Sequence, residues 1–198
     1  VLNKKKSLKE SIKFIFNPKV FFSKSATSDY KVFFINQIIM LLISPHLLTQ
    51  ITIATALYFF FFEINFIDMG LFATAPKYII ISLFTLTHFV VDDFSKYIVH
   101  RWMHRWPFLW ALHKVHHSAT NLTPMTVFRT HPLEGLVFTL RSAFAQGLTI
   151  STFVYLFGGG VDLYTVLGAN LFVFLFNVFG SNLRHSHIGI RYWKWLEY

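Results

Sequence analysis

The stretch from Tyr78 to His104 reads YIIISLFTLTHFVVDDFSKYIVHRWMH and carries the main structural signal of the chain. Its first half, Tyr78 to Val91, contains no charged residue and is suited to a bilayer, which about 20 apolar residues cross as a helix. Its second half brings in acidic and basic residues and then two histidines. The pattern predicts one helix that leaves an apolar environment and continues into water without a break.

The composition places the rest of the chain in the same environment. Apolar residues make up 54% of the 198 residues, with 25 phenylalanines, and charged residues make up 14%, against about 25% in soluble domains. So much apolar surface cannot be hidden in the core of a chain this short, and a bilayer is its natural solvent. We therefore expect an all-α, polytopic membrane protein.

Three further uncharged runs complete this expectation. The run Val32–Phe62 is interrupted at Ser44-Pro45-His46, and we expect one long kinked helix, because each half alone is too short to cross a bilayer. The runs Ser142–Val161 and Leu163–Leu183 are expected to form a helical hairpin that turns at Gly158-Gly159-Gly160. Together with Tyr78–Val91, they give about four transmembrane helices within a membrane domain of residues 32–198.

The basic residues give the predicted orientation. Eight lysines lie between Lys4 and Lys31, and residues 1–31 are expected to form a basic amphipathic segment, either an interfacial helix or a flexible tail. Lysines beside apolar runs mark the cytoplasmic side, so we assign the net charge of +9 to the membrane surface and expect no nucleic-acid partner. If the chain crosses the membrane about four times, the N-terminus and the histidine clusters lie on the same, cytoplasmic side. We expect the clusters to form a helical cap there.

Two histidine clusters follow the apolar helix. His100 and His104 have the spacing H-x-x-x-H, and His113, His116 and His117 have the spacing H-x-x-H-H. Residues three and four apart share one face of a helix, so each cluster can aim its imidazoles at one point. Imidazole binds Fe, Zn, Cu and Ni, and the chain has no cysteine to supply a thiolate. The spacing predicts a transition-metal site, whereas an isolated histidine is usually structural.

Two other classes of metalloprotein fit the pattern less well. A zinc protease needs glutamate beside the first histidine, as in H-E-x-x-H, and Arg101 occupies that position. A membrane metal-binding or transport protein would hold its ligands within the spans. Here both clusters lie just past the end of an apolar run, which favours catalysis at the interface.

The histidines and their neighbours resemble one known family, the fatty acid hydroxylase and sterol desaturase superfamily of membrane histidine-box oxygenases. The resemblance runs from about Asp92 to Tyr198. The segments that carry it are Asp93-Phe94, Tyr97, His100-Arg101, His104, Leu109-Trp110, His113-Lys114-Val115-His116-His117-Ser118, Asn121-Leu122-Thr123, Arg129-Thr130-His131-Pro132-Leu133-Glu134 and His185-Ser186-His187-Ile188.

The resemblance implies a function and its cofactors. Two iron ions, with O2 as co-substrate, would oxidise an unactivated C–H bond of a membrane lipid, by hydroxylation or by desaturation. Electrons would come from a separate donor, a reductase with a ferredoxin or a cytochrome b5-like carrier. The lipid itself stays open between a fatty acyl chain, a sterol, an ether lipid and a carotenoid.

The same resemblance completes the set of candidate site residues. The expected metal ligands are His100, His104, His113, His116, His117, His185 and His187. Asp93 lies seven residues before His100 and hence on its helical face, where it would accept a hydrogen bond from a ligand imidazole or remain a solvated carboxylate. His131 would play either a structural role or the same supporting role. His88 and Asp92, four residues apart, are a candidate pair inside the membrane.

The number of donors raises a further expectation. Two irons need more protein ligands than the two boxes supply, and the resemblance implies a third H-x-x-H-H box beyond the isolated histidine. The chain ends 13 residues after His185 and begins at Val1 without a methionine. We therefore expect the membrane domain to be C-terminally incomplete in this sequence.

Overall fold

The computed structural model describes residues 13, 16–47, 49–65 and 67–179. Within these residues every regular element is helical, which confirms the predicted all-α class. The α-helices are α2 (Pro18–Phe21), α3 (Lys24–Ile43), α4 (Gln50–Ile64), α5 (Lys77–Arg105), α6 (Pro107–His113), α7 (Pro132–Phe157) and α8 (Leu163–Phe179). Short 3-10 turns are η1 (Ser44–His46), η2 (His116–Ser118), η3 (Pro124–Phe128) and η4 (Gly158–Gly160).

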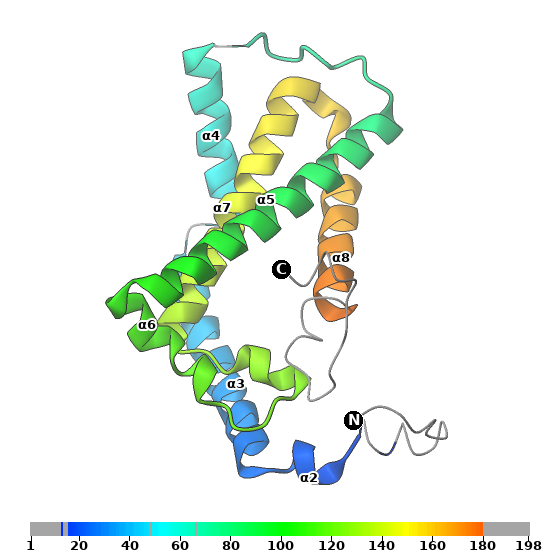
Figure 1. Ribbon diagram of the computed structural model, residues 1–198. Coiled ribbons are helices and arrows are strands. Elements are labelled where there is room, and N and C mark those ends of the chain that lie inside the picture. The colour runs from blue at the N-terminus through cyan, green and yellow to red at the C-terminus, as the bar shows by residue number, and fades with distance from the viewer. Residues whose placement is uncertain (1–12, 14–15, 48, 66, 180–198) are drawn as a thin grey trace.

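Helix α5 is the long helix expected from the opening stretch. Its 29 residues extend for about 43 Å at 1.5 Å per residue, and its last turns carry His100 and His104. It ends at Arg105, and the next residue, Trp106, has an extended backbone (φ −96°, ψ 123°), because the following proline disfavours helical geometry in the residue before it. Pro107 then begins α6, so the chain turns sharply at the end of α5, as Figure 1 shows.

Two of the helices, α3 and α5, are long and apolar enough to cross a membrane by length and composition, and α4 and α8 are shorter apolar helices. Large apolar side chains are exposed on all four, among them Leu41, Phe59, Leu86 and Phe174. An apolar surface of this extent favours a membrane environment. The number of spans, which we expected to be about four, stays a prediction.

The region Val32–Phe62 differs from the single kinked helix that we expected. Helix α3 begins at Lys24 and ends at Ile43, η1 follows, and α4 starts at Gln50 with the Thr49 hydroxyl accepting from the Thr52 amide (3.2 Å). Pro45 supplies no amide hydrogen, and its ring clashes with a preceding helical turn, so the helix stops there and a new one is capped. In Figure 1, α4 continues in roughly the direction of α3.

The start of α3 also changes the expectation for residues 1–31. In the described part of this segment the chain forms α2, and α3 then begins with Ser23 as its N-cap, so one interfacial helix does not run through to Lys31. Helix α3 therefore passes through the boundary expected between residues 31 and 32. Residues 1–12 and 14–15 lie outside the described part.

The predicted turn at Gly158-Gly159-Gly160 is confirmed, with α7 and α8 joined at η4, but α7 begins at Pro132, ten residues before the run Ser142–Val161 that we expected. Gly158 has a φ of +60°, a backbone conformation that glycine adopts without strain. Asp162 then caps α8 by accepting from the Thr165 amide (2.8 Å), and it also binds Lys77 at the start of α5 (2.8 Å). The hydrogen bonds from Lys77 and Thr165 hold the pKa of Asp162 well below its usual range.

Helix α7 is the central element, with α4 and α5 packed against it (Figure 1). A Cβ at Gly147 would lie 2.8 Å from the Ile53 side chain and 3.0 Å from the Gln50 carbonyl oxygen, so glycine permits the close approach of α4. At the far end of the molecule from the histidines, α5, α7 and α8 share an apolar core of Ile80, Phe84, Phe153, Phe157 and Ala169.

A buried ion pair joins α5 to α7 nearer the histidines. Asp92 binds Arg141 (2.9 Å) and Lys96 (3.3 Å). The carboxylate of Asp92 therefore pairs with Arg141 and Lys96, and it makes no hydrogen bond to His88, its candidate partner, among the described residues. Paired charges of this kind are the form in which ionised groups are tolerated away from water.

Candidate metal centre

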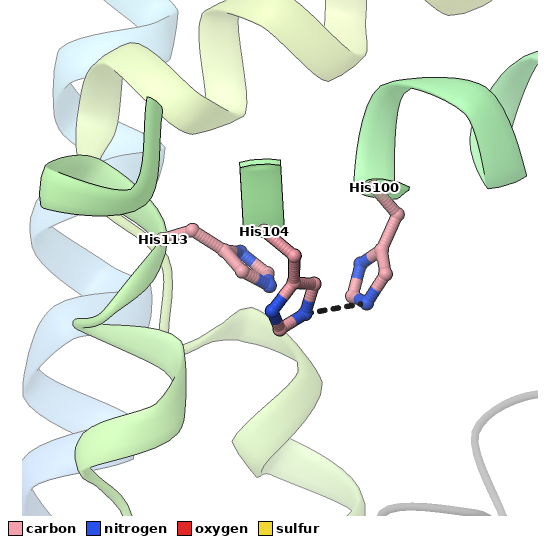
Figure 2. A group of neighbouring side chains, drawn as sticks. All are labelled: His100, His104 and His113. Atoms are coloured by element: carbon pink, nitrogen blue, oxygen red, sulfur yellow. Dashed lines mark hydrogen bonds between the residues drawn. The ribbon is translucent and has the colours of Figure 1, made fainter. Parts of the chain in front are cut away.

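The first histidine cluster lies on the last turns of α5. His100 and His104 are four residues apart on the helix, and their Nε2 atoms lie 3.1 Å from each other. Figure 2 shows the His104 ring between those of His100 and His113. The i, i+4 spacing thus brings both side chains to one point, as the sequence predicted.

The second cluster reaches the same point from α6. The turn at Trp106–Pro107 folds α6 back, and its last residue is His113. One ligand atom of each of His100, His104 and His113 lies within 4.8 Å of the others. Three imidazoles from two helices therefore converge to a spacing that suits a metal ion.

His116 and His117 join this group without a continuous helix. Helix α6 ends at His113, and η2 begins at His116, so the single helical face expected for the H-x-x-H-H box is wrong. The turn nevertheless brings the His117 Nε2 within 3.2 Å of the His113 Nε2. The His116 ring stacks on that of His113 with a centroid distance of 5.4 Å. All five histidines of the two boxes therefore lie in one cluster.

Glu134, on the first turn of α7, anchors the centre of the cluster. Its Oε1 lies 2.7 Å from the His113 Nδ1, and both side chains are only 2% exposed. A carboxylate at Nδ1 holds the proton on that nitrogen and leaves Nε2 free to bind a metal, which is the usual support for a histidine ligand. The Glu134 Oε2 has no hydrogen-bond partner among the described residues.

Glu134 belongs to the segment Arg129–Glu134 that carries the family resemblance, but it is not among the site residues predicted from the sequence. Its 21-residue separation from His113 follows no helical spacing. One signal was available, because Glu134 is the only acidic residue between Pro132 and Val161, and an isolated carboxylate in an apolar helix needs a partner.

Neither of the two expected supporting residues makes a hydrogen bond to a clustered imidazole among the described residues. Asp93 is exposed and lines the same cavity as the histidines, but it makes no hydrogen bond to an imidazole among residues 67–179. His131 is the N-cap of α7, and its Nδ1 accepts from the Leu133 amide (3.2 Å). His185 and His187 lie outside the described residues.

A cavity of about 660 Å³ opens beside the cluster. Four of the five histidines line it, His104 excepted, together with the apolar side chains of Val127, Phe128 and Phe138. The remaining lining residues are Asp93, Lys96, Tyr97, Thr130, Glu134 and Gly135. The lining of the cavity therefore contains both imidazole nitrogens and apolar side chains.

The residues present fit a first-row transition metal. The donors are imidazole nitrogens, which suit Fe, Zn, Cu and Ni. The carboxylate of Glu134 is buried against His113, with one oxygen unpaired among the described residues, which adds negative charge beside an imidazole that would bind the cation. Trp110 packs against His104 and His117 (centroids 5.4 and 5.5 Å) and shields the cluster on that side.

Comparison with known proteins gives a consistent result. The model of the fatty acid hydroxylase family matches residues 85–198. A Delta(7)-sterol 5(6)-desaturase of Eremothecium gossypii is 36% identical over 73 residues, which are 36% of this chain and 20% of that protein. A Dictyostelium discoideum protein named as a methylsterol monooxygenase is 29% identical over 133 residues, 64% of this chain and 45% of that protein. The chain thus spans less than half the length of either relative, and no solved structure gives a significant match.

Proposed function

The chain belongs to the fatty acid hydroxylase family, and we propose that it is the histidine-box part of an integral-membrane oxidoreductase. The enzyme would use two iron ions and O2 to hydroxylate or desaturate a C–H bond of a lipid. The single observation that carries the proposal is the convergence of five imidazoles beside an apolar-walled cavity, with His113 held by a buried carboxylate. The names of the two relatives, a sterol desaturase and a methylsterol monooxygenase, support a lipid as substrate.

The proposed ligands are the five clustered histidines, His100, His104, His113, His116 and His117, with His185 and His187 as further donors. When bound, iron supplies the redox chemistry with O2 that an unactivated C–H bond requires. The protein's own side chains hold and orient the ligands. Glu134 keeps the proton of His113 on Nδ1, at 2.7 Å, and so turns Nε2 toward the metal.

The cavity supports a lipid substrate on physical grounds. Val127, Phe128 and Phe138 contribute apolar surface to its lining, which would exclude water and receive a hydrocarbon chain. The exposed apolar helices α3 and α5 suit a membrane, from which such a chain could enter directly. In this proposal the protein is multi-pass, with the N-terminus and both histidine boxes on the cytoplasmic side.

Electrons would come from a separate donor, a reductase with a ferredoxin or a cytochrome b5-like carrier. The surface around the boxes is basic, with Arg101, Arg105 and Lys114 all exposed. A positive surface favours an acidic partner through electrostatic complementarity.

The test is reconstitution of the purified full-length protein in nanodiscs. Fe(II) should support O2-dependent oxidation of a sterol or fatty acyl lipid, detected by mass spectrometry, with chemical reduction replacing the electron donor. Zn(II) should bind but not support turnover. Full turnover with Zn(II) and none with Fe(II) would refute an oxygenase, and metal transport into vesicles without O2 consumption would favour the transport alternative.

A matched pair of variants tests the cluster in the same assay. His104→Ala removes a member of the cluster and should abolish turnover while leaving membrane insertion intact. His131→Asn keeps an N-cap on α7, because asparagine caps helices well, and should retain bound metal. Near-normal turnover in His104→Ala would remove that residue from the site.

A further inference from the structure

The turn that carries His116 and His117 has little regular structure of its own. Between the end of α6 at His113 and the start of α7 at Pro132, the chain forms only the short turns η2 and η3. Short 3-10 turns are weakly stabilised by their own hydrogen bonds. The position of these two imidazoles therefore depends on contacts with other elements.

Helix α3 supplies those contacts from one of its faces. Ser25, Asp29 and Asn36 follow one another at spacings of four and seven residues, which align along a helix. The Ser25 hydroxyl accepts from the Thr120 amide (3.2 Å). The Asn36 side-chain amide donates to the Thr130 carbonyl (2.8 Å). Both bonds join α3 to the segment between the histidine box and α7.

Asp29 lies at the centre of these contacts between α3 and the segment before α7, and it is fully buried, at 0% exposure. Its Oδ1 accepts from the Arg129 Nη1 (3.0 Å), and its Oδ2 accepts from the Thr126 hydroxyl (2.8 Å). Both carboxylate oxygens are therefore paired. A buried carboxylate of this kind tolerates little displacement of its partners, since loss of either leaves charge without solvation.

Arg129 connects Asp29 to the second histidine box. Its Nε donates to the Ser118 hydroxyl (3.1 Å), and Ser118, the residue next to His117, donates in turn to the Val115 carbonyl (2.7 Å). A path of short polar contacts thus runs from Asp29 through Arg129 to the turn that presents His116 and His117. The family match begins at residue 85 and does not include α3.

From this path we propose that Asp29 is a positioning residue for the second histidine box. It holds the turn of His116 and His117 against α3 before any metal is bound, so that their imidazoles meet those of α5 and α6. The N-terminal helix is then a functional part of the metal centre and not only a membrane anchor. The expected effect of Asp29 on metal affinity rests on the proposed function, whereas its role in holding the turn against α3 does not.

The test makes two measurements on the apo full-length protein in nanodiscs. One is a Co(II) titration, and the other is amide hydrogen exchange of the loop formed by residues 116–128. Asp29→Asn should raise the Kd for Co(II) about tenfold, at the lower end of what loss of a supporting contact costs, and change the visible bands of bound Co(II). It should also speed exchange of the loop in the apo protein. Ser25→Ala, a milder change that should fold, is expected to shift both quantities in the same direction.

The control is Asp92→Asn, which breaks another buried carboxylate–arginine pair, Asp92 with Arg141, but does not touch the loop. It should lower the melting temperature without changing the Co(II) Kd or loop exchange. An unchanged Kd and unchanged exchange in Asp29→Asn would overturn the inference, as would an equal loss of affinity in Asp92→Asn. If the wild-type protein bound no Co(II), the proposed function would fail, and loop exchange alone would then decide whether Asp29 holds the turn.

Discussion

Removal of the Glu134 carboxylate should weaken metal binding in a protein that still folds. Glu134 and His113 are each 2% exposed and 2.7 Å apart, so this is a short contact that water does not screen. Mutation of a group that hydrogen-bonds to a histidine ligand typically costs 10- to 100-fold in metal affinity, about 1.4 to 2.8 kcal/mol. We expect a loss in this range for Glu134→Ala.

Two substitutions separate the charge of Glu134 from its shape. Glu134→Gln keeps a carbonyl oxygen for the His113 Nδ1 but replaces a charge-assisted hydrogen bond by a neutral one, which is roughly half as strong. Glu134→Ala leaves the buried Nδ1 unpaired, at a cost of about 1–3 kcal/mol. The Kd for the metal should therefore rise in the order wild type, Glu134→Gln, Glu134→Ala.

The assay is competition for Fe(II) or Co(II) between the apo protein and a chelator of known affinity, with a melting curve of each apo variant. Gln146→Leu is the control, because Gln146 is also a buried polar residue of α7 and bonds only to Asn170 (2.8 Å) among the described residues. It should leave the Kd unchanged. An unchanged Kd in a folded Glu134→Ala protein would refute the role that we assign to this carboxylate.

Two further predictions concern topology and packing. Reporter fusions after Thr27 and after Asn121 should both report the cytoplasm and one at Asp68 the opposite side; opposite signals from Thr27 and Asn121 would contradict the predicted spans. Gly147→Val should lower stability by about 1–3 kcal/mol through overpacking against α4, whereas Gly168→Ala, where nothing lies within 4 Å of the added Cβ, should be neutral or stabilising in the same melting assay.

Features determined by local spacing could be predicted from the sequence. The i, i+4 relation of His100 and His104 directly predicted their convergence, and the uncharged run from Tyr78 predicted α5. The glycines at 158–160 marked the turn of the α7–α8 hairpin. Each of these depends on residues within a few positions of one another, where periodicity carries the information.

Among the local expectations that were wrong, two lie at places where the helical spacing continues in the sequence but the helix ends in the structure. At Pro45 the length of the apolar run led us to expect one continuous helix. The chain instead breaks there, and a new helix begins after the N-cap Thr49. The second box continues past His113 with helical spacing, but α6 ends at His113. The imidazoles still converge, because a tight turn also brings residues three and four apart together.

The contacts that support the site were beyond the reach of periodicity, because they join distant parts of the chain. Glu134 meets His113 across 21 positions, and Asp29 meets Arg129 across 100. Expected partners at regular spacing, such as Asp93 for His100, do not form such contacts among the described residues. Only the fold brings the carboxylates to their partners.

The acidic residues suggest a rule that could have found these contacts. The chain has nine Asp and Glu residues, and Asp29, Asp92 and Glu134 are buried. Each pairs with a cationic or imidazole side chain from another segment. Since an unpaired charge in such surroundings is costly, a carboxylate inside an apolar or membrane-facing helix predicts a distant partner. In this chain two of the three partners, His113 and Arg129, lie in or beside the second histidine box, so the few acidic residues indicate which contacts hold the histidine cluster in place.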